Sequence, residues 1–92
     1  MISVESTARF RACLRRQSLN REEVFRAMQR TAAAWGRPHL HGSAGVRRLR
    51  SGLCECRCGL AVRLLFRPEP DRLVFDFAGN HDEVRAYLKN LG

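Results

Sequence analysis

Residues 46–80 read VRRLRSGLCECRCGLAVRLLFRPEPDRLVFDFAGN, and this stretch decides the fold. Three runs within it, Leu53–Cys58, Val62–Arg67 and Arg72–Phe77, largely alternate between apolar and polar or charged side chains. A period of two is typical of strands that bury one face, and short turn-like links join these runs. The sequence therefore predicts three antiparallel strands with a common apolar face.

The lengths of the two links set the register of these strands. A three-residue loop at 59–61 places Cys56 opposite Leu64, so that the apolar faces of the first two strands coincide. A four-residue loop after Arg67 places Leu64 opposite Phe75 and extends that face to the third strand. We therefore expect one continuous apolar face.

The same register predicts a row of charged side chains, Arg57–Arg63–Asp76, across the other face of the sheet. Two arginines directly opposite each other should cost about 0.2–1 kcal/mol relative to a neutral pair. An anion bound over the row would relieve this repulsion, which favours a binding site. In the alternative interpretation, Asp76 neutralises Arg63 and Arg57 points into water. Geometry alone slightly favours this second interpretation.

Apolar spacing and capping signals predict the other elements. They are a short edge strand around Ile2 and Val4, a helix from Ser6 or Thr7 to a break at Gln17, a second helix from an N-cap at Asn20 to Trp35, a loop at Arg37–Gly45, a short strand at Arg47–Arg50, and a C-terminal helix capped by Asn80 and Glu83. Two helices with a short link are expected to pack as a hairpin. The fold class is thus a two-layer α+β domain spanning residues 1–92. Its helical hairpin packs on a sheet of three or four antiparallel strands, followed by a short C-terminal helix.

The chain is strongly basic for its 92 residues, with a net charge of +8 and an isoelectric point near 10.9. Such a charge attracts phosphate backbones, anionic membranes or an acidic protein. No apolar stretch approaches the roughly 20 residues that a membrane-spanning helix needs, and no signal-peptide pattern opens the chain. We therefore expect a cytoplasmic protein that makes no membrane contact.

The four cysteines raise the question of disulfides or zinc. Cys54, Cys56 and Cys58 alternate along one strand, whereas zinc sites usually pair cysteines within a turn, and Cys13 falls on the apolar stripe of the first helix. We expect four reduced core residues that pack as small hydrophobic side chains. His39 and His41 form a pair that could bind metal, but we expect two exposed loop histidines, and no metal or cofactor.

Four short motifs appear in order along the second half of the chain. They are Leu49–Gly52 (LRSG), Arg57–Gly59 (RCG), the strand residue Arg63, and Gly79–His81 (GNH). This pattern resembles the RelE/ParE superfamily of bacterial toxins from toxin–antitoxin systems. The resemblance covers residues 45–88, while the N-terminal half agrees in the placement of its helices.

The resemblance implies a metal-independent endoribonuclease that cleaves mRNA on the ribosome through attack of a ribose 2′-hydroxyl on the adjacent phosphate. By position, Arg63 and Arg57 would act on phosphate, and His81 would transfer a proton near neutral pH. The pKa of arginine is too high for it to serve as a general base, so Glu55 is the candidate base. The candidate RNA-binding residues are Arg48, Arg50, Arg67, Arg85 and Tyr87. The position of the family's C-terminal aromatic falls on Arg85, with Tyr87 on a neighbouring face.

The resemblance also implies an acidic antitoxin protein as partner, with the toxin and antitoxin forming a hetero-oligomer. Two alternatives keep the same fold. One is a ParE-type inhibitor of DNA gyrase, which needs no catalytic residues, and the other is a non-catalytic module that binds RNA or protein. A zinc-binding module is a more distant alternative.

Overall fold

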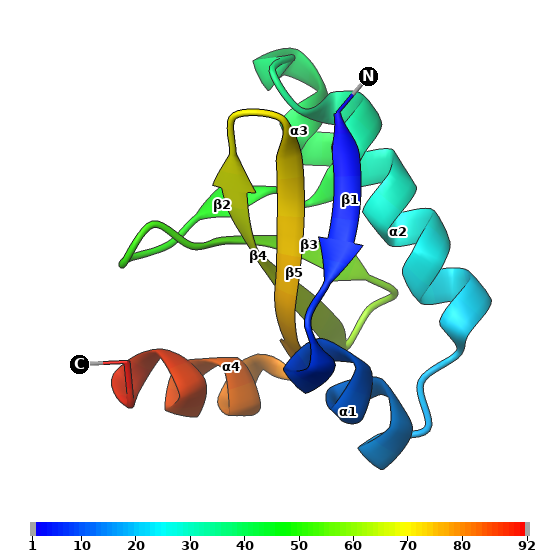
Figure 1. The fold of residues 1–92 in the computed structure, drawn as a ribbon, viewed down its shortest axis with the longest axis vertical. Helices are drawn as coiled ribbons and strands as arrows, with labels where there is room; N and C mark the ends of the chain where they lie inside the picture. Colours follow the sequence, from blue (N-terminus) through cyan, green and yellow to red (C-terminus); the bar gives the residue numbers. More distant parts are fainter. Residues whose placement is uncertain (1, 92) are drawn as a thin grey trace.

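The computed structural model describes residues 2–91 and shows an α+β arrangement of strands and helices (Figure 1). In chain order the elements are β1 Ser3–Ser6, α1 Ala8–Arg16, α2 Arg21–Ala34, α3 Pro38–Ala44, β2 Arg47–Arg48, β3 Cys54–Cys58, β4 Val62–Glu69, β5 Arg72–Gly79 and α4 His81–Lys89. The single domain at 1–92 stays a prediction, because its terminal residues, Met1 and Gly92, lie outside the described range. No helix in residues 2–91 is both long enough and apolar enough to cross a membrane.

The strands form one five-stranded sheet with the order β1-β5-β4-β3-β2. The predicted edge strand is present, but β1 pairs with β5 in the parallel direction, while the other pairs are antiparallel. The prediction of three or four antiparallel strands was therefore incomplete. Alternation identifies a strand but not the direction of its neighbour, and a parallel pair needs a long crossover, which the intervening helices supply here.

The β3–β4 hairpin has the predicted register. Cys56 lies opposite Leu64, and Arg57 lies opposite Arg63. Gly59 begins the loop with a φ of 72°, a backbone conformation that glycine adopts without strain. The apolar and charged faces of these two strands are thus as expected.

The β4–β5 register differs from the prediction because the connecting turn is shorter. Strand β4 runs on to Glu69, which lies opposite Arg72, and only residues 70–71 form the turn. Arg72 Nε lies 2.8 Å from Glu69 Oε1 across this turn. Pro70 suits the second position of such a tight turn, and Pro68 lies within β4, opposite Leu73.

A β-bulge changes the register again further along the pair. Phe66 faces Phe75 but Leu65 faces Phe77, so β5 has one extra residue, Asp76, between its paired positions. Beyond the bulge Leu64 faces Ala78 rather than Phe75. Bulges of this kind reverse the side-chain alternation locally and cannot be read from a period-two pattern.

Helices α1 and α2 pack against one face of the sheet (Figure 1). The hydrophobic core comprises Phe10, Cys13, Leu14, Val24, Ala27, Met28, Ala32, Cys54, Cys56, Cys58, Leu64, Phe66, Leu73, Phe75 and Ala78. Helix α1 mainly contacts β5, whereas α2 contacts α3, β3 and β1. The two helices therefore do not form the predicted hairpin. Each packs its apolar stripe against strands of the sheet instead. All four cysteines are free and buried in this core, as predicted.

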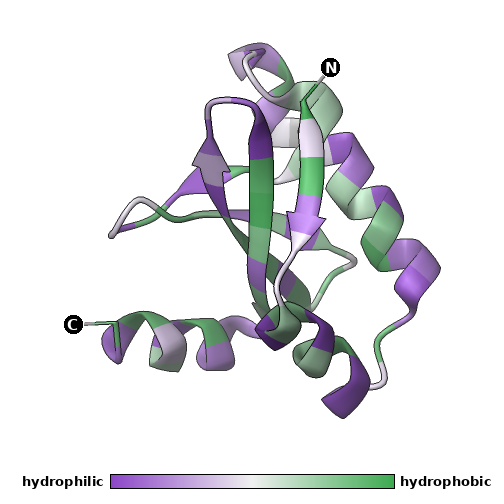
Figure 2. Cartoon of the chain, viewed as in Figure 1, coloured by the Kyte–Doolittle hydropathy of each residue, from purple (hydrophilic) through white to green (hydrophobic). Residues whose placement is uncertain are grey.

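Helix α4 is the predicted C-terminal helix, and it contacts β5 and β4. Tyr87 stacks on Phe77, a half-buried residue that also packs against the core, with ring centroids 4.3 Å apart. The predicted Asn80–Glu83 capping box is present. Figure 2 shows hydrophobic and hydrophilic residues alternating around α4, as expected for a helix with one buried side.

The segment predicted as the loop Arg37–Gly45 contains helix α3. Pro38 is its first residue, and Gly45 ends it in the left-handed conformation, with a φ of 69°. Both are favourable helix-end residues, but the short length and the internal glycine concealed the helix. His41 lies in this helix and stacks on Trp35. Strand β2 is also shorter than predicted and ends at Arg48 rather than at Arg50.

Candidate functional site

A cleft of about 440 Å³ opens between α3, the strands β2–β4 and the start of α4. All four residues predicted as catalytic, Glu55, Arg57, Arg63 and His81, line it. The structure therefore brings together side chains that are up to 26 residues apart in sequence. Their chemical roles stay a prediction, but their common location is a structural finding.

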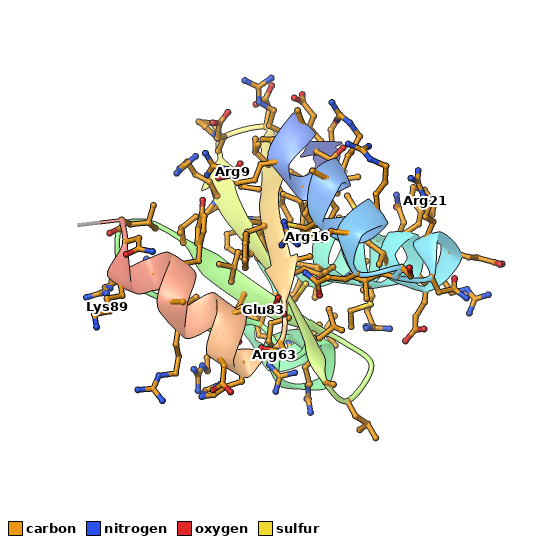
Figure 3. The ribbon with its side chains drawn as sticks, turned by 90° about the horizontal axis from the view of Figure 1, so that it is seen from below. Arg9, Arg16, Arg21, Arg63, Glu83 and Lys89 are labelled. Atoms are coloured by element: carbon orange, nitrogen blue, oxygen red, sulfur yellow. The ribbon has the colours of Figure 1, made fainter. Side chains whose placement is uncertain are left out.

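Strand geometry explains why these residues converge. Glu55 and Arg57 alternate with the buried cysteines of β3, and Arg63 faces Arg57 from β4. Arg63 also lies opposite Gly79 of β5, which ends two residues before His81. Figure 3 shows Arg63 beside the first turn of α4. The bulge in β5 thus determines which residue of β5 faces Arg63, and with it the position of His81.

Glu55 is held between two arginines on the cleft wall. Its Oε2 lies 3.4 Å from Arg63 Nε, and its Oε1 lies 3.4 Å from Arg47 in β2. The Glu55 side chain is only 9% exposed, so these cations compensate a largely desolvated carboxylate. The predicted neutralisation of Arg63 by Asp76 is wrong, because Glu55 takes that place.

Asp76 instead belongs to a polar cluster that ties α1 to α4. It accepts hydrogen bonds from the hydroxyls of Thr7 (2.8 Å) and Tyr87 (2.9 Å). Arg9 lies 3.3 Å from Asp76 and also donates to the Tyr87 hydroxyl. Burial, and then the hydrogen bond to Asp76, raise the pKa of Tyr87 above its ordinary value. Tyr87, predicted to bind RNA, is thus placed in this cluster and not in the cleft.

Arg57 is positioned by the end of α3. Its guanidinium donates to the Gly42 carbonyl at 3.3 Å. Its side chain crosses Gly45 so closely that a Cβ there would lie 2.5 Å from Arg57 Nε. Gly45 is therefore needed both for its backbone conformation and for the room it leaves to Arg57.

Sequence reasoning missed four residues that line the cleft, Gly42, Gly45, Val46 and Arg47, of which Arg47 and Gly45 matter most for its charged side chains. Arg47 faces Glu55 across the β2–β3 pair, but this pairing could be found only once the register around the Ser51–Gly52 turn was known. Gly45 was noted only as a loop glycine. The sequence did offer one signal for Gly45. It follows Pro38 at the distance of a short helix and comes shortly before a strand.

A second, larger groove of about 690 Å³ lies between the segment after β2 and helix α4. Of the predicted RNA-binding residues, Arg50 and Arg85 line it. Arg50 also donates to the Leu88 carbonyl at 2.9 Å, which ties this segment to the end of α4. Arg48 and Arg67 are exposed on β2 and β4 and line neither groove nor cleft. The predicted RNA-binding set is therefore spread over several surfaces.

The site offers cationic and proton-transfer groups rather than a metal-binding set. Within residues 2–91 no group of three or more histidine, cysteine or acidic side chains is arranged to hold a metal ion. The cleft instead combines paired guanidinium groups, which suit phosphate oxygens, with a carboxylate and an imidazole, which can exchange protons.

Comparison with known proteins reveals similarity in structure but not in sequence families. No protein-family model matches the sequence. No curated protein matches it either.

Several solved structures share the fold over most of their length. YafQ from E. coli strain BL21(DE3) superposes with a TM-score of 0.68 at 13% identity, covering 91% of this chain and 98% of YafQ. The YoeB–YefM complex from Staphylococcus aureus gives 0.60 at 12% identity, covering 88% of this chain and 98% of the matched chain. The toxin–antitoxin complex RelBE2 from Mycobacterium tuberculosis gives 0.54 at 21% identity, covering 87% and 98%.

These similarities define the class of fold. The chain has the fold of RelE-type toxins from type II toxin–antitoxin systems, as its motifs indicated. The alternative of a ParE-type gyrase inhibitor receives no support from them.

Proposed function

We propose that this protein is the toxin of a type II toxin–antitoxin system, an endoribonuclease that cleaves mRNA on the ribosome without a metal ion. The observation that carries the proposal is the convergence of Glu55, Arg57, Arg63 and His81 on one cleft. The fold shared with YafQ and RelBE2 supports the same reaction class.

Each of these four residues has a role in this reaction. Glu55 accepts the proton of the ribose 2′-hydroxyl as that oxygen attacks the adjacent phosphorus. Arg57 and Arg63 stabilise the negative charge that develops on the pentacoordinate phosphorane. His81 then donates a proton to the departing 5′-oxygen. The products are a 2′,3′-cyclic phosphate and a free 5′-hydroxyl, and the enzyme is restored when His81 regains the proton taken up by Glu55.

The exposed arginines around the cleft hold the RNA backbone. Arg50 and Arg85 line the neighbouring groove, and Arg48 and Arg67 are exposed on the strands. Contacts of this kind neutralise phosphates without reading sequence, so they add affinity that falls as salt rises. Tyr87 contributes in this account by holding α4 in place rather than by stacking on a base.

An acidic antitoxin is the partner that this account requires, and the two act in the cytoplasm. The similar structures include the DinJ–YafQ, YoeB–YefM and RelBE2 complexes. The first and the last of these are described as toxin–antitoxin complexes. The net charge of +8 on this chain favours a negatively charged partner. A hetero-oligomer of toxin and antitoxin is therefore the expected resting form.

Growth inhibition by single-residue variants tests the proposal. Arg63→Ala should abolish growth inhibition on induced expression, because it removes a phosphate-binding cation from the cleft. The matched control is Arg26→Ala, which removes the same charge from an exposed ion pair on α2 and should inhibit growth as the wild type does. Thermal unfolding confirms that both variants fold. Full toxicity of a folded Arg63→Ala protein would reduce Arg63 to a partner of Glu55 and would favour a binding module.

A further inference from the structure

Arg47 is the one cation of the cleft that the reaction described above leaves without a role. It faces Glu55 across the β2–β3 pair, and its guanidinium lies 3.4 Å from Glu55 Oε1. Its side chain is 73% exposed, whereas that of Glu55 is only 9% exposed. Arg47 therefore reaches from the solvent over a buried carboxylate, and beyond Glu55 its guanidinium has no ion-pair partner among the side chains that the structure describes.

Glu55 fixes the spacing of the arginines on either side of it. One carboxylate oxygen contacts Arg47 and the other contacts Arg63. Arg57 stands directly opposite Arg63 in the neighbouring strand. Two guanidinium groups thus flank one carboxylate, and a third, that of Arg57, lines the same cleft.

The charges of this cleft are not balanced by the protein itself. The lining has the three cations Arg47, Arg57 and Arg63 against the single anion Glu55, a net charge of +2 before any charge on His81 is counted. Like charges facing each other across a pair of strands are unfavourable, and an anion bound among them offsets the repulsion. A ligand with two negative charges matches the cleft better than a ligand with one.

We propose that Arg47 completes a three-arginine site that selects doubly charged phosphate over singly charged phosphodiester. The inference rests on the proposed function, since it assigns the charge preference of the same cleft. A phosphodiester has one negative charge, while the phosphorane formed after loss of the 2′-proton has two. An interaction that is stronger with the phosphorane than with the phosphodiester speeds the reaction, whereas an interaction of equal strength only holds the substrate. Arg47 is then a binding residue for the transition state.

Stable nucleotides reproduce this difference in charge without a ribosome. Adenosine 3′-monophosphate is close to a dianion at pH 7.5, because the second pKa of a phosphomonoester is about 6. Adenosine 2′,3′-cyclic monophosphate is a monoanion with the same base and sugar. Their affinities for the purified toxin are measured by calorimetry or by NMR titration at pH 7.5 and low salt.

The wild type should bind the 3′-monophosphate about tenfold more tightly than the cyclic nucleotide, as one extra negative charge beside three guanidinium groups warrants. Arg47→Ala should weaken binding of the 3′-monophosphate about tenfold and lower its preference over the cyclic nucleotide to about threefold or less. Arg47→Lys should restore much of the preference, because it restores the charge. Arg26→Ala, which removes an exposed arginine on α2, should leave both affinities unchanged.

Equal affinity of the wild type for the two nucleotides would overturn the inference, as would equal losses in Arg47→Ala and Arg26→Ala. These outcomes are distinct from failure of the proposed function. Selective binding without mRNA cleavage supports the charge preference and contradicts the endoribonuclease. Cleavage without selective binding overturns the role of Arg47 and leaves the endoribonuclease standing.

Discussion

The side chains of β3 have opposite chemistry on its two faces, and this division can be tested one residue at a time. Cys56 is fully buried on the core side, whereas Glu55 and Arg57 form the cleft. Burial raises the pKa of the Cys56 thiol from about 9 to about 11, because the charged thiolate would lose its hydration. The same strand thus keeps one face neutral and the other charged.

Cys56→Ala should destabilise the protein by about 1 kcal/mol through lost apolar contact and a small cavity. Urea unfolding at pH 7 measures this loss, and an added chelator should not change the stability of the wild type. Unfolding of the wild type on chelation would contradict the core assignment and reveal a structural metal.

The pH dependence of the same variant provides a control. The folded pKa of Cys56 lies above its unfolded value, so its contribution to stability is complete below about pH 9 and is lost as pH rises towards about 11. Wild-type stability should therefore fall more steeply than that of Cys56→Ala in this window. Parallel curves would show that Cys56 ionises as easily in the folded protein as in the unfolded chain.

Among the elements, the short helix α3 forms one side of the cleft. Its end positions Arg57 through the Gly42 carbonyl and through the close approach to Gly45. A helix of seven residues has little stability of its own, so packing must hold it, and it contacts α2.

Two glycine substitutions in this region should have opposite effects. Gly45→Ala should destabilise by about 1–2 kcal/mol, because alanine is strained at a positive φ, and its Cβ would also collide with Arg57. Gly42→Ala, which meets nothing within 4 Å, should stabilise α3 by about 0.5–1 kcal/mol. Thermal or urea unfolding measures both. Equal effects of the two substitutions would show that Gly45 has no special role in positioning Arg57.

The elements also show what sequence reasoning could and could not provide. The β3–β4 register followed from loop length and facing residues, so the opposition of Arg57 and Arg63 was predictable. The bulge at Asp76 was not, because a period-two pattern does not show where a strand takes up an extra residue. In the structure Asp76 accepts hydrogen bonds from Thr7 and Tyr87.

The same limit applied to the candidate site. Arg57, Arg63 and His81 came from motif resemblance, and Glu55 was added as a substitute base beside Arg57. Their convergence required the β4–β5 register, which the bulge sets. Arg47 was missed because a two-residue strand has too few positions to show alternation.

For the whole molecule, the dominant property is its charge of +8 on a small domain. An acidic antitoxin segment would be attracted over a distance by this charge, while its apolar side chains provide most of the affinity once it is ordered. Its carboxylates would meet exposed arginines such as Arg48, Arg50 and Arg67. Charge therefore acts mainly on the encounter of the two proteins.

Raising the salt concentration should slow association of the toxin with its antitoxin strongly and change dissociation little. Stopped-flow or surface-binding kinetics between about 50 and 500 mM salt measure both rates. If salt acted chiefly on dissociation, the basic surface would not steer the antitoxin, and it would be reserved for RNA.

The most direct test of the proposed function is the cleavage of a defined mRNA on purified ribosomes. We expect the wild-type protein to cut the mRNA only when ribosomes are present, leaving a 2′,3′-cyclic phosphate and a 5′-hydroxyl. Folded Arg63→Ala and His81→Gln proteins should cut at least about 100-fold more slowly, the scale on which charge stabilisation and acid catalysis act. Intact mRNA in a reaction where the wild-type protein still blocks translation would contradict the account, and so would undiminished cleavage by the folded Arg63→Ala protein.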